Sequence, residues 1–506
     1  MEVESGRAPG SREVSAASTL PRMIRALPAI LAGAAAVCLF PHPARAQAEN
    51  RSSAQSPYYG SVTTTPATGE TLDLSLGEAI DRAIHSNLAL VEARDQEKAV
   101  QFARMVSLQS LLPGITAQAD AGEHQINLAE YGFTPKVIGL FAPLFPGENF
   151  SHVSTVVQVT VVDARVNYSQ SLLSLPDIER YREAKEDVRA AFYNQRSARG
   201  LTVLTVGTDY LQTLALAAQV ESAGALLRAD QALLDNTVEE HRAGAAANLD
   251  ELRAQVQLQA QQQSLLQAQE NLAKAKIALN REIGLPAEQP IRLTDTAPYS
   301  ELSSMPIEEA REVAYRSRQD YQGLRAQIRA AEMERKAAGW ERLPSLQFSG
   351  NYGFIGVGGG VYHGTFAAVG TLSVPIFEEG RLRGDREAAD SRLNRLRQQF
   401  ASLREQIDEQ IRESMLDLNS DAELVRVGQS NVALARTELE QAVARFQAGV
   451  DDNLPVVQAQ ATLARAESDL IASVSQHNQA KLRLARSLGI VDTQYKTYIA
   501  ANPSSR

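Results

Sequence analysis

The sequence predicts a mainly α-helical protein with two β-rich regions, built from one structural unit that is used twice. The first observation is a duplication: the segments that begin at Glu78 and Glu309, 231 residues apart, match without a gap up to a proline in each half. The second is a further match at a spacing of 205 residues, which begins near Gly244 and Gly449. A duplication of this length makes each half build the same unit, so the halves should pack as equivalents.

The two spacings also locate an insertion. Because the spacing falls from 231 to 205 residues, the first half carries roughly 26 extra residues between Pro113 and Asp209. The expected domains are a first repeat at 73–286 and a second repeat at 305–490. A linker at 287–304 joins the repeats and is expected near the middle of the long molecule, in its equatorial region. A tail at 491–506 follows the second repeat.

Residues 1–46 have the features of a secretory signal peptide. A short basic start at Met23 precedes an apolar run that ends at Phe40, and Ala44-Arg45-Ala46 fits a cleavage site. Met23 is therefore a candidate for the true start. An uncleaved anchor is the alternative, although the run is too short for a permanent span. The only cysteine, Cys38, lies in this run, so burial or oligomerisation must stabilise the mature chain without disulfides.

The charge of the chain bounds its partners. The formal charge is −10, and removal of residues 1–46, with five Arg and three Glu, leaves −12. An acidic chain disfavours nucleic acid as a partner and is compatible with a cation-preferring pore or a periplasmic surface. No stretch after residue 46 is apolar enough for a membrane-spanning helix, so a crossing of the membrane would require a closed β-barrel.

The elements follow in the same order in each half. Residues 47–72 are rich in Ser, Thr, Pro and Gly and are expected to be a linker. Ser75 and Glu78 form a capping box at the start of the first helix, and Pro306 suits the same place in the second half. Each helix is predicted to run to the proline that ends the matched segment, Pro113 or Pro344.

Two β-rich regions come after these prolines, at about 114–171 and 345–377. Both lose Lys and Arg and gain β-branched residues, aromatics and Gly, and the glycines from Gly353 to Gly360 are typical of a hairpin loop. Each region is therefore expected to hold a pair of strands. The aromatic residues suit either a belt at a membrane interface or the core of a soluble β-sandwich. The composition of the two regions does not distinguish between these two alternatives.

Two unequal helical hairpins are predicted, at about 176–284 and 380–489. Gly244 and Gly449 mark their turns, because Gly adopts the left-handed conformation that ends a helix. The first long arm, of about 67 residues, would measure roughly 100 Å at ~1.5 Å per residue. Two modest apolar seams in the last arm suit a helix with a neighbour on each flank, as in the wall of a cylinder. The Gln-rich run at 255–269 is interpreted as a polar helix face.

These features together resemble the TolC-type outer-membrane efflux protein family. The most specific motif runs from Leu372 to Arg381 and is similar to the family's strand-to-helix junction, with Pro375, Phe377 and Gly380 at the matching positions. The first-half counterpart, from Tyr168 to Leu173, is degraded. The resemblance covers about residues 72–490, nearly all of the mature chain.

The resemblance implies a homotrimer in the bacterial outer membrane, in contact with its lipid, with a long periplasmic extension. Each copy would give four strands to one shared twelve-stranded β-barrel, and the helices would form an α-helical barrel across the periplasm. The chain would be the passive exit duct of a tripartite efflux or type I secretion system. Its partners would be a periplasmic adaptor (membrane fusion) protein and an inner-membrane pump of the RND, ABC or MFS type.

The resemblance also implies that the adaptor docks at the helical tips. The turn residues that match between the halves are Gly244, Asn248, Leu249, Gly449, Asn453 and Leu454.

Acidic side chains narrow the tip in some members of the family, but the matching positions here are Pro455 and Gln458. We therefore hypothesise that three copies of neighbouring carboxylates form the constriction, which would favour cations and resist closure unless the charges are paired. The alternative is that acids near helix N-termini complement the helix dipole. The carboxylates concerned are Asp250, Glu251, Asp451 and Asp452.

No enzyme activity, cofactor or metal is expected. The seven His are scattered without metal-ligand spacing, and the sequence has no nucleophile elbow, phosphate loop or dinucleotide fingerprint. The alternative function is a periplasmic adaptor or spacer built from helical hairpins, although two tandem hairpins, each entered from a strand pair, argue against it. A diffusion porin would need many more strands and no helices of ~100 Å. The sequence does not indicate the cargo.

Overall fold

The computed structural model describes residues 56–63, 66–144, 146, 154–244, 247–296, 299–302, 305–358, 360 and 362–499. The expectations for the signal peptide, including Met23 and Cys38, and for the tail beyond residue 499 lie outside these residues. No described helix combines the length and the apolar character that a membrane-spanning helix needs.

The duplicated unit predicted from the sequence is confirmed, because both repeats run helix, helix, strand pair, long helix, short helix. The first repeat contains α1 (Leu76–Ser86), α2 (Leu88–Gln109), β2 (Gly114–Asn127), β3 (Val156–Leu173), α4 (Leu175–Arg242) and α5 (Asn248–Glu282). The second contains α6 (Ile307–Ser317), α7 (Gln319–Trp340), β5 (Ser345–Val357), β6 (Tyr362–Ser373), α8 (Glu379–Gln447) and α9 (Leu454–Ser487).

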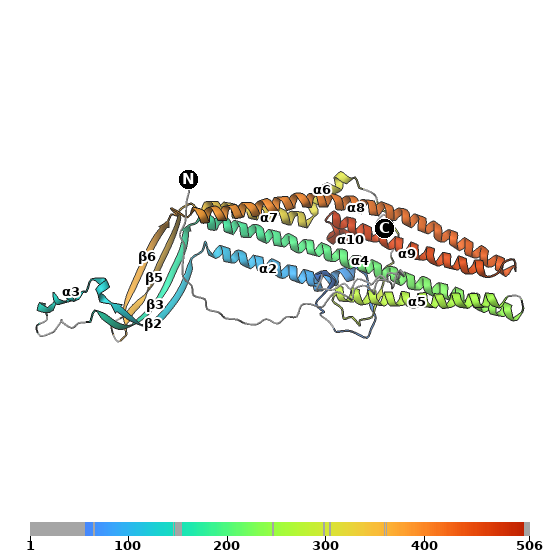
Figure 1. The fold of residues 1–506 in the computed structure, drawn as a ribbon, viewed down its shortest axis with the longest axis horizontal. Coiled ribbons are helices and arrows are strands. Elements are labelled where there is room, and N and C mark those ends of the chain that lie inside the picture. The colour runs from blue at the N-terminus through green and yellow to red at the C-terminus, as the bar shows by residue number, and fades with distance from the viewer. Residues whose placement is uncertain are drawn as a thin grey trace, which may run out of the picture. The chain divides into compact units, whose positions relative to one another are not determined.

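The two strand pairs join into one antiparallel sheet in the order β2-β3-β5-β6 (Figure 1). Val166, Tyr352 and Phe366 align across three of its strands. Tyr352 is 71% exposed and Phe366 is 80% exposed. The aromatics of this sheet therefore do not fill a sandwich core within one copy of the chain.

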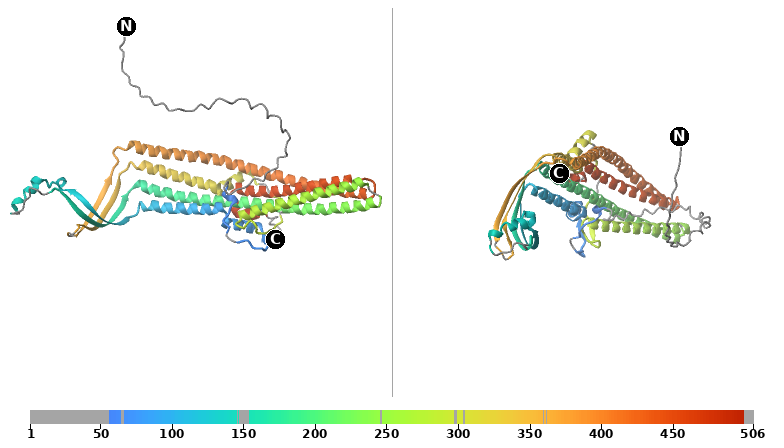
Figure 2. Two further views of the ribbon diagram at one scale, coloured as in Figure 1. Left: turned by 60° about the horizontal axis from the view of Figure 1, so that its bottom comes forward. Right: turned by 60° about the vertical axis from the view of Figure 1, so that its left-hand side comes forward.

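The helices form a row in which α4 is central. Near the sheet, α4 packs between α2 and α7, and α7 packs on α8; towards the tips, α4 packs between α5 and α9, and α9 packs on α8. Figures 1 and 2 show α2, α4, α7 and α8 continuing from β2, β3, β5 and β6 in this order. The outer helices carry exposed apolar side chains: Phe102, Met105 and Val106 of α2; Leu252, Val256 and Leu266 of α5; and Leu416, Val427 and Leu434 of α8.

The largest hydrophobic core lies where α1, the middle of α4, the C-terminal ends of α5 and α9 and a small parallel sheet meet. That sheet pairs β1 (Leu72–Leu74) with β4 (Ile291–Leu293), which lies in the linker between the repeats. The single hydroxyl hydrogen of buried Tyr210 is shared between two acceptors, Leu74 O at 2.9 Å and Asp295 Oδ2 at 2.7 Å. Asp295 Oδ2 also accepts from the backbone N–H of Leu76 at 2.6 Å, so one carboxylate ties the linker to the start of α1.

The predicted single helix before each proline is wrong, because each is broken into two. Asn87 has ψ 132° and Arg318 has ψ 121°, both extended conformations that a helix cannot contain. The Asn87 side chain accepts from Ala89 N at 3.1 Å and caps α2. The apolar periodicity runs through both breaks, so the hydrophobic pattern alone did not reveal them.

Several connections also differ from the expectation. The expected linker at 47–72 contains a 3₁₀ turn, η1 (Pro57–Tyr59), and the expected tail contains α10 (Val491–Ile499). The expected hairpin loop is shorter than predicted, because β5 continues to Val357. The extra residues of the first repeat fall between β2 and β3, a connection that contains η2 (Leu128–Tyr131), α3 (Pro135–Gly139) and η3 (Ala142–Leu144).

Candidate functional site

Each helical hairpin turns at a glycine, as the sequence predicts. Gly244 has φ 74° and Gly449 has φ 67°, which lie in the left-handed region. A Cβ is strained in this region, so Gly is favoured at both positions. The two turns form the tip that the sequence analysis assigned to adaptor docking.

The first turn is tied to the second by an arginine. Arg253 of α5 donates through Nη1 to Asp250 Oδ1 at 3.3 Å and to Asp452 Oδ2 at 3.0 Å. Asp250 is buried, whereas Asp452 is half exposed. The structure thus brings together two of the four predicted carboxylates, one from each hairpin, around one cation.

Asp451 points to a different partner. Arg445, in the last turns of α8, donates through Nε to Asp451 Oδ2 at 2.6 Å. The Arg445 hydrogen bond holds the pKa of the Asp451 carboxyl below its usual value. Asp451 is therefore ionised and paired with its own hairpin, and it does not join the cluster around Arg253.

Glu251 lies in the first turn of α5 with Asp250. Its Oε2 is 3.6 Å from His241 Nδ1, near the end of α4. Both acids of α5 are placed where a negative charge complements the helix dipole, which is the alternative that the sequence analysis left open. A role of the four acids in gating remains a prediction.

The side chain of Asn453 joins the two turns by a hydrogen bond to the backbone of the other hairpin. Its side chain is fully buried, and Nδ2 donates to Asp250 O at 2.7 Å. Its Oδ1 has no hydrogen-bond partner in the structure. Asn248, the matching residue of the first repeat, begins α5 and is exposed. The duplicated Asn-Leu pair therefore has different surroundings in the two turns.

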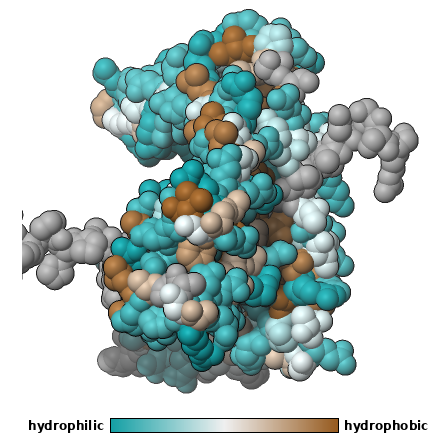
Figure 3. All heavy atoms as spheres, turned by 90° about the vertical axis from the view of Figure 1, so that its right-hand side faces the viewer, coloured by the Kyte–Doolittle hydropathy of each residue, from teal (hydrophilic) through white to brown (hydrophobic). Residues whose placement is uncertain are grey.

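Two grooves flank the tip. The first is apolar and lies between α5 and α9, where Leu249, Leu252 and Leu454 contribute to its lining. The second lies along α8 and α9 and is lined in part by Asp451, Pro455 and Gln458, so the positions that match the family's acidic gate share a groove with Asp451. Figure 3 shows separate hydrophobic patches on a largely hydrophilic surface at this end of the protein.

The junction motif lies at the other end of α8, where Pro375 and Phe377 connect β6 to the helix. Ile376 and Phe377 are 94% and 90% exposed, and Gly380 lies in the first turn of α8 with no atom within 4 Å of an added Cβ. Within one copy of the chain, these motif residues therefore make few packing contacts.

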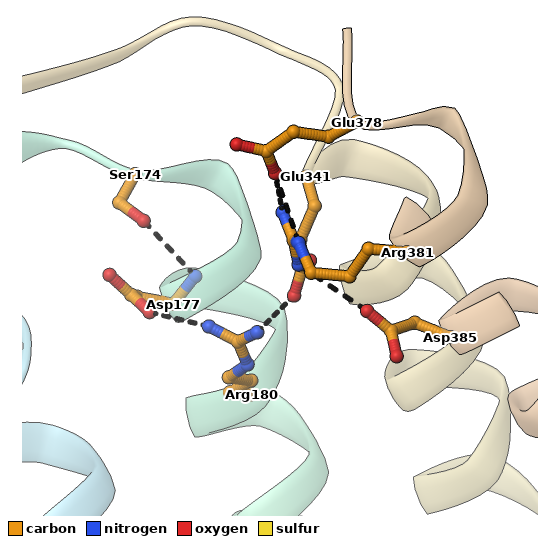
Figure 4. A network of polar contacts seen from close by, with 7 residues as sticks. All are labelled: Ser174, Asp177, Arg180, Glu341, Glu378, Arg381 and Asp385. Carbon is orange, nitrogen blue, oxygen red and sulfur yellow. Dashed lines mark hydrogen bonds and ion pairs between the residues drawn. The ribbon is translucent and has the colours of Figure 1, made fainter. Parts of the chain in front are cut away.

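A charged network crosses this junction (Figure 4). Glu341, just after α7, accepts from Arg180 of α4 and from Arg381 of α8, the latter with Nη1 2.7 Å from Oε2. The Glu341 side chain is 15% exposed, and it links the first repeat to the second where the strands meet the helices.

Further contacts hold the two arginines in place. Arg180 also donates to Asp177 Oδ1 at 3.1 Å, and Ser174 Oγ caps α4 by accepting from Asp177 N at 3.4 Å. Arg381 also donates to Glu378 Oε2 at 2.6 Å and to Asp385 Oδ2 at 3.3 Å. Arg381 lies in the junction motif and is recognisable from the sequence, whereas the only sequence signal of Glu341 is its position before a helix-ending proline.

The described side chains contain no group of His, Cys, Asp or Glu that could hold a metal ion. The tip acts through its charges. Three of its described carboxylates each form an ion pair with an arginine, so their negative charges are partly neutralised within one copy: Asp250, Asp451 and Asp452. Sequence reasoning missed Arg253 and Arg445 as their partners.

A strand pair and an unequal helical hairpin, each present twice, define the fold of the described chain. The outer membrane protein VceC from Vibrio cholerae has this fold, with a TM-score of 0.67 and 18% identity over 82% of this chain and 96% of VceC. The CmeC outer membrane channel of Campylobacter jejuni gives a TM-score of 0.68 and 15% identity over 89% of this chain and 96% of CmeC. At these identities the likeness shows the fold alone.

The model of the protein family described as "Outer membrane efflux protein" matches residues 79–285 and 311–490, one match in each repeat. The chain belongs to this family, which confirms the predicted outer-membrane location and excludes the adaptor alternative. It is a family of channels and not of enzymes. The pyoverdine export outer membrane protein OpmQ of Pseudomonas aeruginosa is 27% identical over 322 residues, 61% of this chain and 65% of that relative. The chain thus matches less than two thirds of the relative's length.

Proposed function

We propose that this chain is the exit duct of a tripartite export system. It acts as a homotrimer that passively conducts substrates delivered by an inner-membrane pump and a periplasmic adaptor. The observation that carries the proposal is the open four-stranded sheet. Strands β2 and β6 are its edges, and neither has a further partner strand within the described residues. Unpaired strand edges are not tolerated in lipid, so β6 of one copy must pair with β2 of the next, and three copies give twelve strands.

The exposed face of the sheet supports a membrane setting. Val166, Tyr352 and Phe366 form an aligned apolar row across β3, β5 and β6. Strands of an outer-membrane barrel present such side chains to lipid, with aromatics near the interfaces. Exposure of this row to water in a finished protein would be costly, whereas lipid contact removes the cost.

The free flanks of the helical row support a ring of copies. Near the tips the row ends at α5 on one side and at α8 on the other, and both helices expose apolar side chains. Contact between α5 of one copy and α8 of the next is head-to-tail, and such contacts close into a ring when the rotation fits. The open sheet repeats the same head-to-tail relation, so one rotation satisfies both.

In this proposal the chain performs no catalysis, and its tip turns receive the adaptor. Acidic residues and grooves lie at these turns, where a docked partner would act on the pairing of the tip charges. The name of the Pseudomonas aeruginosa relative makes pyoverdine one cargo to test.

A cysteine cross-link tests the ring. Leu266 of α5 and Val427 of α8 are exposed and lie about 18 and 20 residues from the tip ends of their helices, so they are at similar heights along helices that rise ~1.5 Å per residue. The double variant Leu266→Cys with Val427→Cys, oxidised in membranes, should give bands at two and three times the chain mass in a non-reducing gel.

The two single-cysteine variants are the controls and should give no band at three times the chain mass. Cross-linking confined to one chain, or a ladder beyond three copies, would contradict the proposed trimer. Conduction is tested separately, by the conductance of the purified protein in a planar bilayer.

A further inference from the structure

The first hairpin buries polar side chains at positions where the second hairpin buries alanine, and the duplication makes the comparison direct. At the spacing of 205 residues, buried Ala223, Asp230 and Thr237 of α4 correspond to buried Gly428, Ala435 and Ala442 of α8. These positions recur every seven residues, the spacing of a coiled-coil core position. Asp230 therefore occupies a core position that holds alanine in the second hairpin.

The facing helices repeat the difference. Leu258 of α5 corresponds to Leu463 of α9, and both are buried, but buried Gln261 corresponds to buried Ala466. In the second hairpin, Ala435 and Ala466 belong to one apolar cluster with Val432 and Leu463.

The first hairpin instead satisfies its polar groups only in part. Asp230 is 2% exposed; Gln257 Nε2 donates to its Oδ2 at 3.3 Å, and Oδ1 has no hydrogen-bond partner in the structure. Gln261 Nε2 donates to Ala223 O at 3.0 Å, so it does not serve the carboxylate.

No described cation pairs with Asp230. Arg253 of α5 pairs with Asp250 and Asp452, and Glu467 of α9 pairs with Arg436 of α8. Arg228 of α4 and Arg465 of α9 are exposed and form no ion pair with Asp230. A buried, unpaired carboxylate is costly when ionised, whereas a protonated one can donate a hydrogen bond.

We propose that Asp230 is a proton-binding site in the core of the first hairpin, and that the bound proton holds α4 and α5 together near the tip. The inference goes beyond the exit-duct function and does not rest on it. Burial raises the pKa of Asp230 to about 6, against a hydrogen bond from Gln257 that lowers it. A raised carboxyl pKa means that the stabilisation is complete below the unfolded pKa near 4 and is lost as the pH rises through about 6.

Hydrogen–deuterium exchange of the full chain in detergent tests this, because each molecule contains its own control. Protection of amides at 226–240, corrected for the intrinsic exchange rate, should be about tenfold higher at pH 5.0 than at pH 7.5, as linkage with these pKa values requires. The matched segment at 431–445 should show no such step.

Two variants sharpen the test. Asp230→Asn keeps the shape without the titration and should remove the step, with protection at pH 7.5 close to that at pH 5.0. Ala435→Asp places the same group in the second hairpin and should create a step there. An equal step in both hairpins of the wild type, or a step that persists in Asp230→Asn, would overturn the inference. Failure of the exit-duct proposal would instead appear as the absence of a trimer and would leave the exchange result unchanged.

Discussion

Arg253 and Asp452 lie on different hairpins, and Arg253 Nη1 is 3.0 Å from Asp452 Oδ2. The same guanidinium group reaches buried Asp250, so one side chain neutralises acids from both turns. This contact joins the two halves of the duplication at the place where the duct would narrow.

Arg253→Met should loosen the tip. Loss of an exposed ion pair costs ~0.2–1 kcal/mol, and unpairing of a buried acid costs more, so the opening equilibrium should rise by at least about twofold. The measurement is basal conductance in a planar bilayer. Arg242→Met, which removes an arginine paired with Glu239 within the same helix, is the matched control and should leave the conductance unchanged.

The double variant Asp451→Ala with Asp452→Ala tests the gate hypothesis. The change breaks the pairs of Asp451 with Arg445 and of Asp452 with Arg253, so the tip should loosen and the basal conductance should rise. Loss of six negative charges from a trimeric tip should also weaken the preference for cations. Reversal potentials under a salt gradient report the selectivity. The gate idea fails if both conductance and selectivity match those of the wild type.

The pairing of Asp451 with Arg445 should persist across the physiological pH range. Because the pKa of Asp451 is lowered, the stabilisation is present above its ordinary value near 4 and is lost only as the pH falls through the lower, folded value. Conductance measured from pH 8 to pH 5 should therefore show no step that depends on Arg445. A step that disappears in Arg445→Gln would show that this pair titrates in that range.

Asn453→Ala should destabilise the tip. The residue is fully buried and donates to Asp250 O, and loss of such a partner costs ~1–3 kcal/mol. Limited proteolysis should cut the turns of the variant faster, and exposed Gln458→Ala is the control. Equal cleavage rates in the two variants would show that the buried amide does not hold the turns together.

Glu341→Gln should weaken the link between the repeats below the strands. The carboxylate accepts from Arg180 and Arg381, and hydrogen bonds to charged groups contribute ~1.5–3 kcal/mol. The expected result is a lower temperature of trimer dissociation on a semi-native gel. Glu423→Gln, which breaks an exposed pair with Arg426 within α8, should have little effect.

Local signals in the sequence predicted much of this fold. The capping box at Ser75 and Glu78 is present, and the turns at Gly244 and Gly449 adopt the conformation that favours glycine. The breaks at Asn87 and Arg318 were missed, because the apolar periodicity continues through them.

The arrangement of the tip depends on contacts that sequence spacing does not encode. Arg253 and Asp452 are 199 residues apart and meet only because the two hairpins pack side by side. The burial of Asp230 was missed for a related reason. An acidic side chain on a helix is usually exposed to solvent, and here it is buried only because a second helix packs over it.

The mass and location of the detergent-extracted protein test the central claim most directly. Membrane fractionation with light scattering corrected for detergent should find an outer-membrane species at three times the mass of the mature chain, because four strands cannot close a sheet alone. A soluble periplasmic species, or an outer-membrane species of any other stoichiometry, would contradict the account.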